Sequence, residues 1–105
     1  MTHEPQPGQI QEIIVTATRE LAAEQGIEIA KTLDAETRLF GEGGLLDSMA
    51  LVSLVIAVEQ AVEEKYGTPV ALADEKALSQ RSSPYRTIGT LCAYAAQELA
   101  ARRKA

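Results

Sequence analysis

The stretch LDSMALVSLVIAVEQAVEEKYG, residues 46–67, decides the fold of this chain. Its apolar side chains recur with the period of an amphipathic helix. The members of one apolar stripe are Leu51, Leu54, Val55, Val58 and Val62. Gly67 and Pro69 are residue types that end helices. The sequence therefore predicts a long helix that starts at or next to Ser48, ends near Tyr66 and buries this stripe.

The same segment carries a second apolar stripe on an adjacent face, made of Met49, Val52 and Ile56. A surface helix needs only one apolar face to pack on a core. Either both stripes are buried, or one is kept for a partner. We expect at least part of the second stripe to stay exposed as a docking surface.

Two more long helices are predicted on either side of this segment. The first covers residues 9–26 and ends at Gly26. Its core-facing residues are Ile10, Ile13, Ile14, Ala17 and Leu21. The last helix follows Thr87, a capping residue type. Its core-facing residues are Ile88, Leu91, Cys92, Ala95 and Leu99.

Residues 26–47 form a long connection between the first two helices. Such a length is unusual in a compact domain unless the connection is functional or packed by its own side chains. The segment allows a short helical turn around Ile29–Leu33. The side chains expected to anchor it are Leu33, Leu39, Phe40, Leu45 and Leu46.

After the central helix, Val70 and Leu72 lead to a short third helix around Asp74–Ser79, with Asp74 as its cap. A polar loop over residues 80–84 follows. The predicted fold is therefore all-α: a four-helix bundle with three long helices, one short third helix and a long loop between helices 1 and 2.

The domain is expected to cover residues 9–101, between a disordered leader over 1–8 and a basic tail over 102–105. With 105 residues, 46% hydrophobic and 4% aromatic, the chain has room for one modest aliphatic core. No apolar run approaches the roughly 20 residues that span a bilayer. The leader lacks the pattern of a secretory signal, and one cysteine permits no internal disulfide. A cytoplasmic protein is expected.

Charge is unevenly distributed along the chain. Residues 1–80 hold 14 acidic and 5 basic side chains, a net charge of −9, and residues 81–105 hold 1 and 5, a net charge of +4. The acidic part disfavours nucleic acid and anionic membranes. Arg102, Arg103 and Lys104 are interpreted as complementing the C-terminal end of a helix. We expect a monomer without nucleic-acid binding or stable membrane insertion.

Conventional catalysis is poorly supported. His3 is the only histidine and lies in the leader, so no Ser–His or Cys–His pair can form within the fold. One cysteine and one histidine do not make a transition-metal site. Cys92 lies on an apolar stripe and is expected in the core. A solvated acidic face explains the helically spaced Glu59, Glu63 and Glu64. We therefore predict no enzyme and no metal.

Ser48 remains as a candidate for chemistry, and it directly follows the glycine-rich run GEGGLLD of residues 41–47. A helix start offers unpaired N–H groups and the positive end of the helix dipole, so an anion is stabilised there. Ser48 either caps the helix through its hydroxyl or carries a phosphate-linked group at this position.

Several short segments occur in an informative order. They are Thr37-Arg38-Leu39-Phe40, Leu46-Asp47-Ser48-Met49, Leu54-Val55-Ile56-Ala57-Val58-Glu59, Tyr66-Gly67 and Arg86-Thr87-Ile88-Gly89. Over roughly residues 9–101 this order resembles the carrier-protein family, the acyl carrier proteins and their peptidyl and D-alanyl relatives. In that family, a motif ending in Asp-Ser-Leu or Asp-Ser-Met stands at the head of the second of four helices. The chain most resembles the free-standing bacterial type.

The resemblance implies a cofactor and partners. A phosphopantetheinyl transferase would esterify Ser48 with 4′-phosphopantetheine from coenzyme A, and the thiol of the arm would hold an acyl group as a thioester. Asp47 would present Ser48 or assist its modification. Acyl-loading, acyl-transferring or synthase enzymes would be further partners. The residues assigned to partner binding are Met49, Val52, Ile56 and Glu59.

The cargo is expected to enter the bundle, because an aliphatic core can part around an acyl chain and each buried methylene contributes roughly 0.8 kcal/mol. The residues expected to line this acyl pocket are Leu54, Val55, Val58, Val62, Ile88 and Leu91. Two departures from the family pattern are expected to matter. Ala50 and Ser53 stand where many fatty-acid carriers have acidic residues, which favours specialised fatty-acid, lipid or polyketide synthesis. The 71–84 segment is longer than the third-helix region of ordinary carriers, and it would reshape the acyl pocket or give a partner a distinctive surface to recognise.

Two alternatives remain open. An aminoacyl or peptidyl carrier, of the non-ribosomal peptide or D-alanylation type, shares the fold and the arm, although the Leu-Asp-Ser-Met context favours acyl cargo. An unmodified helical interaction module, in which Ser48 merely caps the helix, belongs to another functional class. Acceptance of phosphopantetheine separates both carriers from this module.

Overall fold

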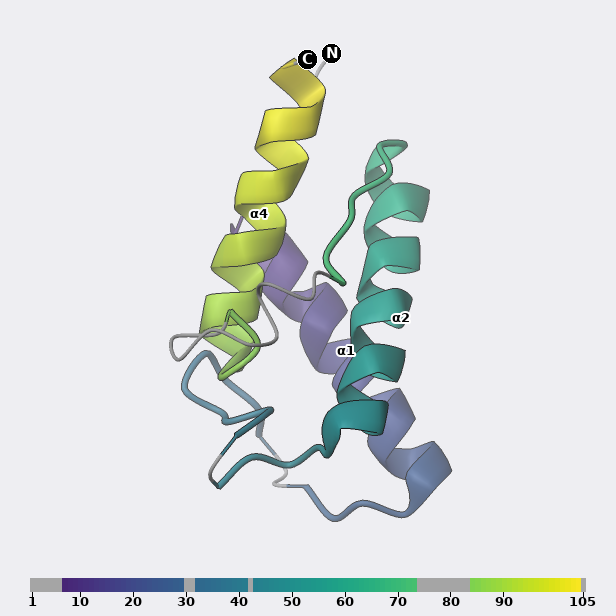
Figure 1. Cartoon of the computed structure of the whole chain (residues 1–105), viewed down its shortest axis with the longest axis vertical. Coiled ribbons are helices and arrows are strands. Elements are labelled where there is room, and N and C mark those ends of the chain that lie inside the picture. The colour runs from purple at the N-terminus through teal and green to yellow at the C-terminus, as the bar shows by residue number, and fades with distance from the viewer. Residues whose placement is uncertain (1–6, 30–31, 42, 74–83, 105) are drawn as a thin grey trace.

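The computed structural model describes residues 7–29, 32–41, 43–73 and 84–104, and three helices account for most of them (Figure 1). The helices are α1 (Pro7–Gln25), α2 (Ser48–Tyr66) and α4 (Ile88–Lys104). The expectation of an all-α fold is confirmed for this part of the chain. The predicted short third helix over 74–79, its Asp74 cap and loop residues 80–83 lie outside the described residues.

The three helices do not pack equally on one another. α1 packs against both α2 and α4, whereas no Cα atom of α2 lies within 8 Å of one in α4. Figure 1 shows α1 crossing behind the other two, with an extended segment descending between α2 and α4. The residues predicted to face the core on all three helices are buried, except the half-buried Ile13.

α1 begins two residues earlier than predicted, at Pro7 rather than Gln9. Proline suits the first helical position because its φ angle is already helical and its missing N–H would have no partner there. Residues 7 and 8 therefore belong to the helix, not to the leader. At the other end Gly26 has φ +68°, and the N–H of Ile27 donates to the Ala22 carbonyl at 2.9 Å.

The ends of α2 and α4 follow their predicted signals. Gly67 adopts φ +69° and donates its N–H to the Glu63 carbonyl, which ends α2. Thr87 and Thr90 form a reciprocal cap at the start of α4: each backbone N–H donates to the other hydroxyl oxygen at 3.0 Å. The predicted Thr87 cap is confirmed.

The long connection between α1 and α2 is anchored as predicted. Leu33, Leu39 and Leu46 are buried, and Phe40 and Leu45 are half-buried against the core. The predicted turn around Ile29–Leu33 is not seen at residues 29, 32 and 33, which lie outside any helix, and residues 30–31 are not among those described.

Backbone hydrogen bonds tie this connection to the start of α4. The Leu39 N–H donates to the Arg86 carbonyl at 2.7 Å, and the Ile88 N–H donates to the Thr37 carbonyl at 3.0 Å. These bonds surround an isolated antiparallel bridge between Arg38 and Thr87. The connection therefore reaches the start of α2 from a fixed position beside α4.

The backbone of the connection passes so close to residue 44 that only glycine fits there. A Cβ there would lie 2.8 Å from the Leu39 carbonyl oxygen and from the Phe40 Cα and N atoms. We expect Gly44→Ala to destabilise the protein by about 1–3 kcal/mol, because backbone rather than a flexible side chain must move. The exposed helical Gly8, where an added Cβ would meet nothing within 4 Å, offers the control Gly8→Ala. Denaturant unfolding measures the free energy of unfolding of both variants and of the unchanged protein. A Gly44→Ala protein as stable as the unchanged protein would mean that this close approach is absent.

Candidate functional site

The start of α2 is capped by Asp47, not by Ser48. Asp47 has extended backbone angles, φ −81° and ψ 178°, and its Oδ1 accepts the Ala50 N–H at 2.8 Å. The Leu51 N–H donates to the Asp47 carbonyl at 2.9 Å, the first backbone bond of the helix. The interpretation of Ser48 as the capping residue is therefore wrong. The register of the connection places Asp47 at the cap and Ser48 at the first helical position.

Ser48 is exposed at this first position. Within the described part of the chain, its hydroxyl makes no hydrogen bond. The first turn of a helix also leaves backbone N–H groups without intrahelical partners, and Asp47 satisfies the one on Ala50. A negatively charged group attached to Ser48 would lie beside the remaining N–H groups and the positive end of the helix dipole.

The second apolar stripe of α2 is on the surface, as predicted. Met49 is 80% exposed, Val52 40% and Ile56 43%, and these are the large apolar side chains most exposed among the described residues. They begin at the residue next to Ser48 and extend along the helix. The first stripe faces the core, so α2 has one buried and one exposed apolar face.

Glu59, which was predicted to bind partners, is half-buried and has an intramolecular role. One of its carboxylate oxygens, Oε2, accepts the backbone N–H groups of both Leu72 and Ala73, the second at 3.1 Å. Glu63 and Glu64 are exposed, in agreement with a solvated acidic face. No local pattern signals the bond from Glu59 to the 72–73 backbone, because the two segments are far apart along the chain.

The residues expected to line an acyl pocket are packed together in the core. Each of them is at most 2% exposed: Leu54, Val55, Val58, Val62, Ile88 and Leu91. They lie in one apolar cluster with Leu72 and Tyr85. Entry of a chain among them would require helices or the neighbouring extended segment to move apart.

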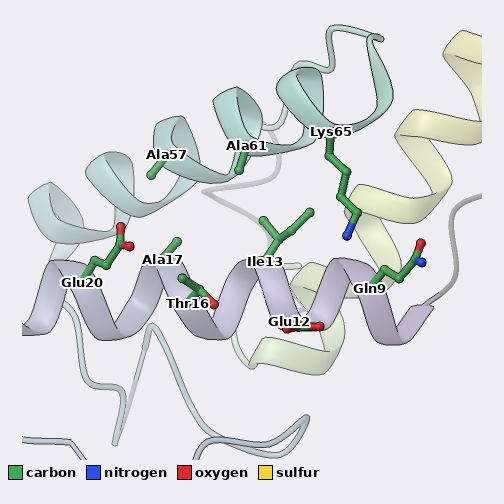
Figure 2. Close-up of a pocket in the computed structure, with 9 residues that line it drawn as sticks. All are labelled: Gln9, Glu12, Ile13, Thr16, Ala17, Glu20, Ala57, Ala61 and Lys65. Atoms are coloured by element: carbon green, nitrogen blue, oxygen red, sulfur yellow. The ribbon is translucent and has the colours of Figure 1, made fainter.

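A surface groove of about 340 Å³ lies elsewhere, between α1 and α2 (Figure 2). It is lined by Gln9, Glu12, Ile13, Thr16, Ala17, Glu20, Ala57, Ala61 and Lys65. None of these residues was predicted as a site residue. On α2 the groove lies on a flank that does not include Ser48 or the exposed stripe, so it is separate from the candidate site.

Metal-ligating and nucleophilic side chains also occur elsewhere in the described residues. No group of three or more His, Cys, Asp or Glu side chains there is placed to hold a metal ion, and His3 is not among them. Cys92 is 6% exposed, and burial raises the pKa of its thiol, which favours the protonated form. No helix in the described ranges is long and apolar enough to cross a membrane.

No protein-family model, no curated protein and no solved structure matches the chain. Any functional proposal for it therefore rests on the residues and geometry of the site.

Proposed function

We propose that this chain is a carrier protein that holds acyl groups as thioesters on a 4′-phosphopantetheine arm esterified to Ser48. The observation that carries the proposal is the division of roles at the start of α2. Asp47 caps the helix, and Ser48 presents an exposed hydroxyl that the cap does not use. A serine needed only for capping would occupy the Asp47 position.

The surroundings of Ser48 support a modified serine. The phosphodiester of the arm is a permanent anion and would be stabilised at the helix N-terminus. Met49, Val52 and Ile56 give a modifying or loading enzyme an apolar surface beside the serine. A flexible arm then lets one bound intermediate reach several active sites at high local concentration.

Asp47 presents Ser48 through backbone geometry in this proposal. Its carboxylate fixes the first turn, so the direction of the Ser48 side chain is set by the helix rather than by a mobile loop. The proposal also includes the complete four-helix bundle, with the short third helix over residues 74–79. The chain itself is a carrier, and the chemistry belongs to its partner enzymes.

Incubation with coenzyme A and a broad-specificity phosphopantetheinyl transferase tests the proposal. The intact mass is expected to rise by one phosphopantetheine group per chain. An unmodified helical interaction module, which remains the alternative of another class, would gain no mass under the same conditions. If only part of the sample is modified but no chain gains more than one phosphopantetheine group, the result still supports a single attachment site.

Acyl cargo and aminoacyl cargo differ in where the attached group goes. An acyl chain long enough to reach the aliphatic core is expected to raise the melting temperature above that of the protein with the bare arm. Each buried methylene contributes roughly 0.8 kcal/mol, so the increase should grow with chain length. A scanning calorimetry series over several chain lengths measures this. Equal melting temperatures across the series would favour an aminoacyl carrier, whose cargo stays outside.

A further inference from the structure

The groove between α1 and α2 has an apolar floor made mostly of short side chains (Figure 2). The floor is formed by the half-buried Ile13 and Ala61, the buried Ala17 and the exposed Ala57. Because the three alanine side chains end at Cβ, the two helices leave a trough of about 340 Å³ between them. The solvent-facing side of a helix is normally polar, so the alanines on this flank of α2 depart from the usual pattern.

Charged side chains stand in a defined order along the groove. Figure 2 shows the two helices running antiparallel, with Lys65 toward the Gln9 end of α1 and Ala57 toward the Glu20 end. Glu12 and Glu20 are both on α1, and the eight residues between their positions correspond to about 12 Å along the helix. Glu12, Glu20 and Lys65 are all exposed, and within the described residues none of them has an ion-pair or hydrogen-bond partner.

The groove faces away from the exposed apolar stripe of α2. Ala57, Ala61 and Lys65 follow the i, i+4, i+8 spacing that keeps residues on one flank of a helix. With 3.6 residues per turn, this flank is roughly opposite to the stripe that begins beside Ser48. A molecule seated in the groove therefore leaves Ser48 and the stripe accessible.

A second copy of this chain is a poor occupant for the groove. The groove carries two acidic side chains and one basic side chain, and the whole chain has a net charge of −5. Two grooves facing each other would bring like charges together, which disfavours association. The complementary occupant carries basic side chains opposite the two glutamates and an acidic one opposite the lysine.

We propose that the groove binds a helical segment of a protein partner that has an acidic residue one turn before two lysines or arginines spaced seven residues apart. The two cations meet Glu12 and Glu20, the acidic residue meets Lys65, and small apolar residues between them cover the alanine floor. This inference goes beyond the carrier function and does not depend on Ser48.

The dimensions of a helix support this occupant. Residues seven apart lie about 10.5 Å apart along a helix, which matches the separation of Glu12 and Glu20 within the reach of flexible side chains. Packed helix axes lie about 8–10 Å apart, and short side chains such as Ala57 and Ala61 permit this close approach. The apolar floor supplies most of the affinity, whereas the exposed ion pairs fix the direction of the bound helix. An acidic residue that meets Lys65 before the cations sets that helix parallel to α1.

A designed peptide tests the proposal on the unmodified protein. The probe is an alanine-rich helix with two lysines seven residues apart and one glutamate one turn before the first lysine. A second peptide exchanges these charges, with two glutamates and one lysine at the same positions. NMR follows the methyl groups of Ala57, Ala61 and Met49 during titration. We expect the first peptide to shift Ala57 and Ala61 but not Met49, and to bind about tenfold more tightly than the second.

Matched variants separate charge from shape. A protein with Glu12→Lys, Glu20→Lys and Lys65→Glu together is expected to prefer the charge-exchanged peptide, because all three groove charges are reversed. Ala57→Phe fills the trough and should weaken binding of the first peptide about tenfold or more. The control Ala93→Phe, at an exposed alanine of α4, should bind like the unchanged protein.

The proposal is overturned if the first peptide leaves Ala57 and Ala61 unshifted, or if the unchanged protein binds the two peptides equally. Unaltered binding by Ala57→Phe would also place the peptide elsewhere and reject the groove. Sedimentation velocity tests the remaining occupant. A dimer of the unchanged protein that Ala57→Phe dissociates and Ala93→Phe does not would assign the groove to a second copy and reject the partner helix.

Discussion

Val58→Glu is expected to unfold the protein, whereas Ile56→Glu, on the same helix, is expected to leave it folded. Val58 has no exposed surface, and Ile56 is 43% exposed. An unpaired carboxylate in an apolar core costs several kcal/mol, compared with a total stability of about 5–15 kcal/mol for a domain of this kind. Circular dichroism and thermal melting measure the difference directly.

Ile56→Glu should nevertheless impair modification of Ser48. If the exposed stripe docks the transferase, a charge in its centre is expected to lower kcat/KM by about tenfold or more. Gln97→Glu, at an exposed position of α4, controls for added negative charge. Unfolding of Ile56→Glu would contradict the exposed position of the stripe, and an unchanged kcat/KM would contradict its role in docking.

Ser48→Ala is expected to abolish attachment of phosphopantetheine completely while leaving stability nearly unchanged. The attachment atom is lost, but the cap is not, because Asp47 supplies it. Asp47→Ala should have the complementary effect on stability: loss of the N-cap typically costs about 1 kcal/mol. Intact mass and denaturant unfolding are measured for both variants.

The expected order of stabilities distinguishes the two roles. A Ser48→Ala protein that is as destabilised as Asp47→Ala would mean that the serine contributes to the cap after all. A Ser48→Ala protein that still accepts the group would place the attachment site elsewhere. Either result can be read without knowing the natural cargo.

The sequence was sufficient for the three described helices because the signals for their stripes and ends are local. Gly26 and Gly67 end α1 and α2 in the left-handed conformation that glycine adopts at low cost. Thr87 starts α4 through a cap with Thr90. The two stripes of α2 separated correctly into a buried and an exposed face, since helical spacing alone determines which residues share a face.

The sequence was not sufficient where contacts between distant segments determine the structure, as they do for the residue that caps α2. Asp47 and Ser48 are both good capping residues, and the cap position depends on how the preceding connection is fixed. That connection is held by the bond from the Leu46 N–H to the Leu39 carbonyl and by Leu39 bonding to Arg86. The local sequence pattern does not predict these hydrogen bonds, and so it does not predict which of the two residues caps the helix.

The position of residues 70–73 escaped prediction for the same reason. Val70 and Leu72 form too short an apolar alternation to indicate where they pack. Their position between α2 and α4 depends on Glu59 and Tyr85, each 13 residues away from Leu72 in sequence. In the sequence alone, Glu59 is indistinguishable from the exposed acids Glu63 and Glu64, because its hydrogen bonds to Leu72 and Ala73 leave no local pattern.

The central claim is that Ser48 carries a phosphopantetheine arm, and site mapping by peptide mass spectrometry tests it most directly. After treatment with coenzyme A and the transferase, fragmentation of the peptide that contains both Ser48 and Ser53 locates the added group. We predict the group on Ser48 alone, with its loss in Ser48→Ala and its retention in Ser53→Ala. An unmodified peptide, or a group on any other residue, would contradict the claim.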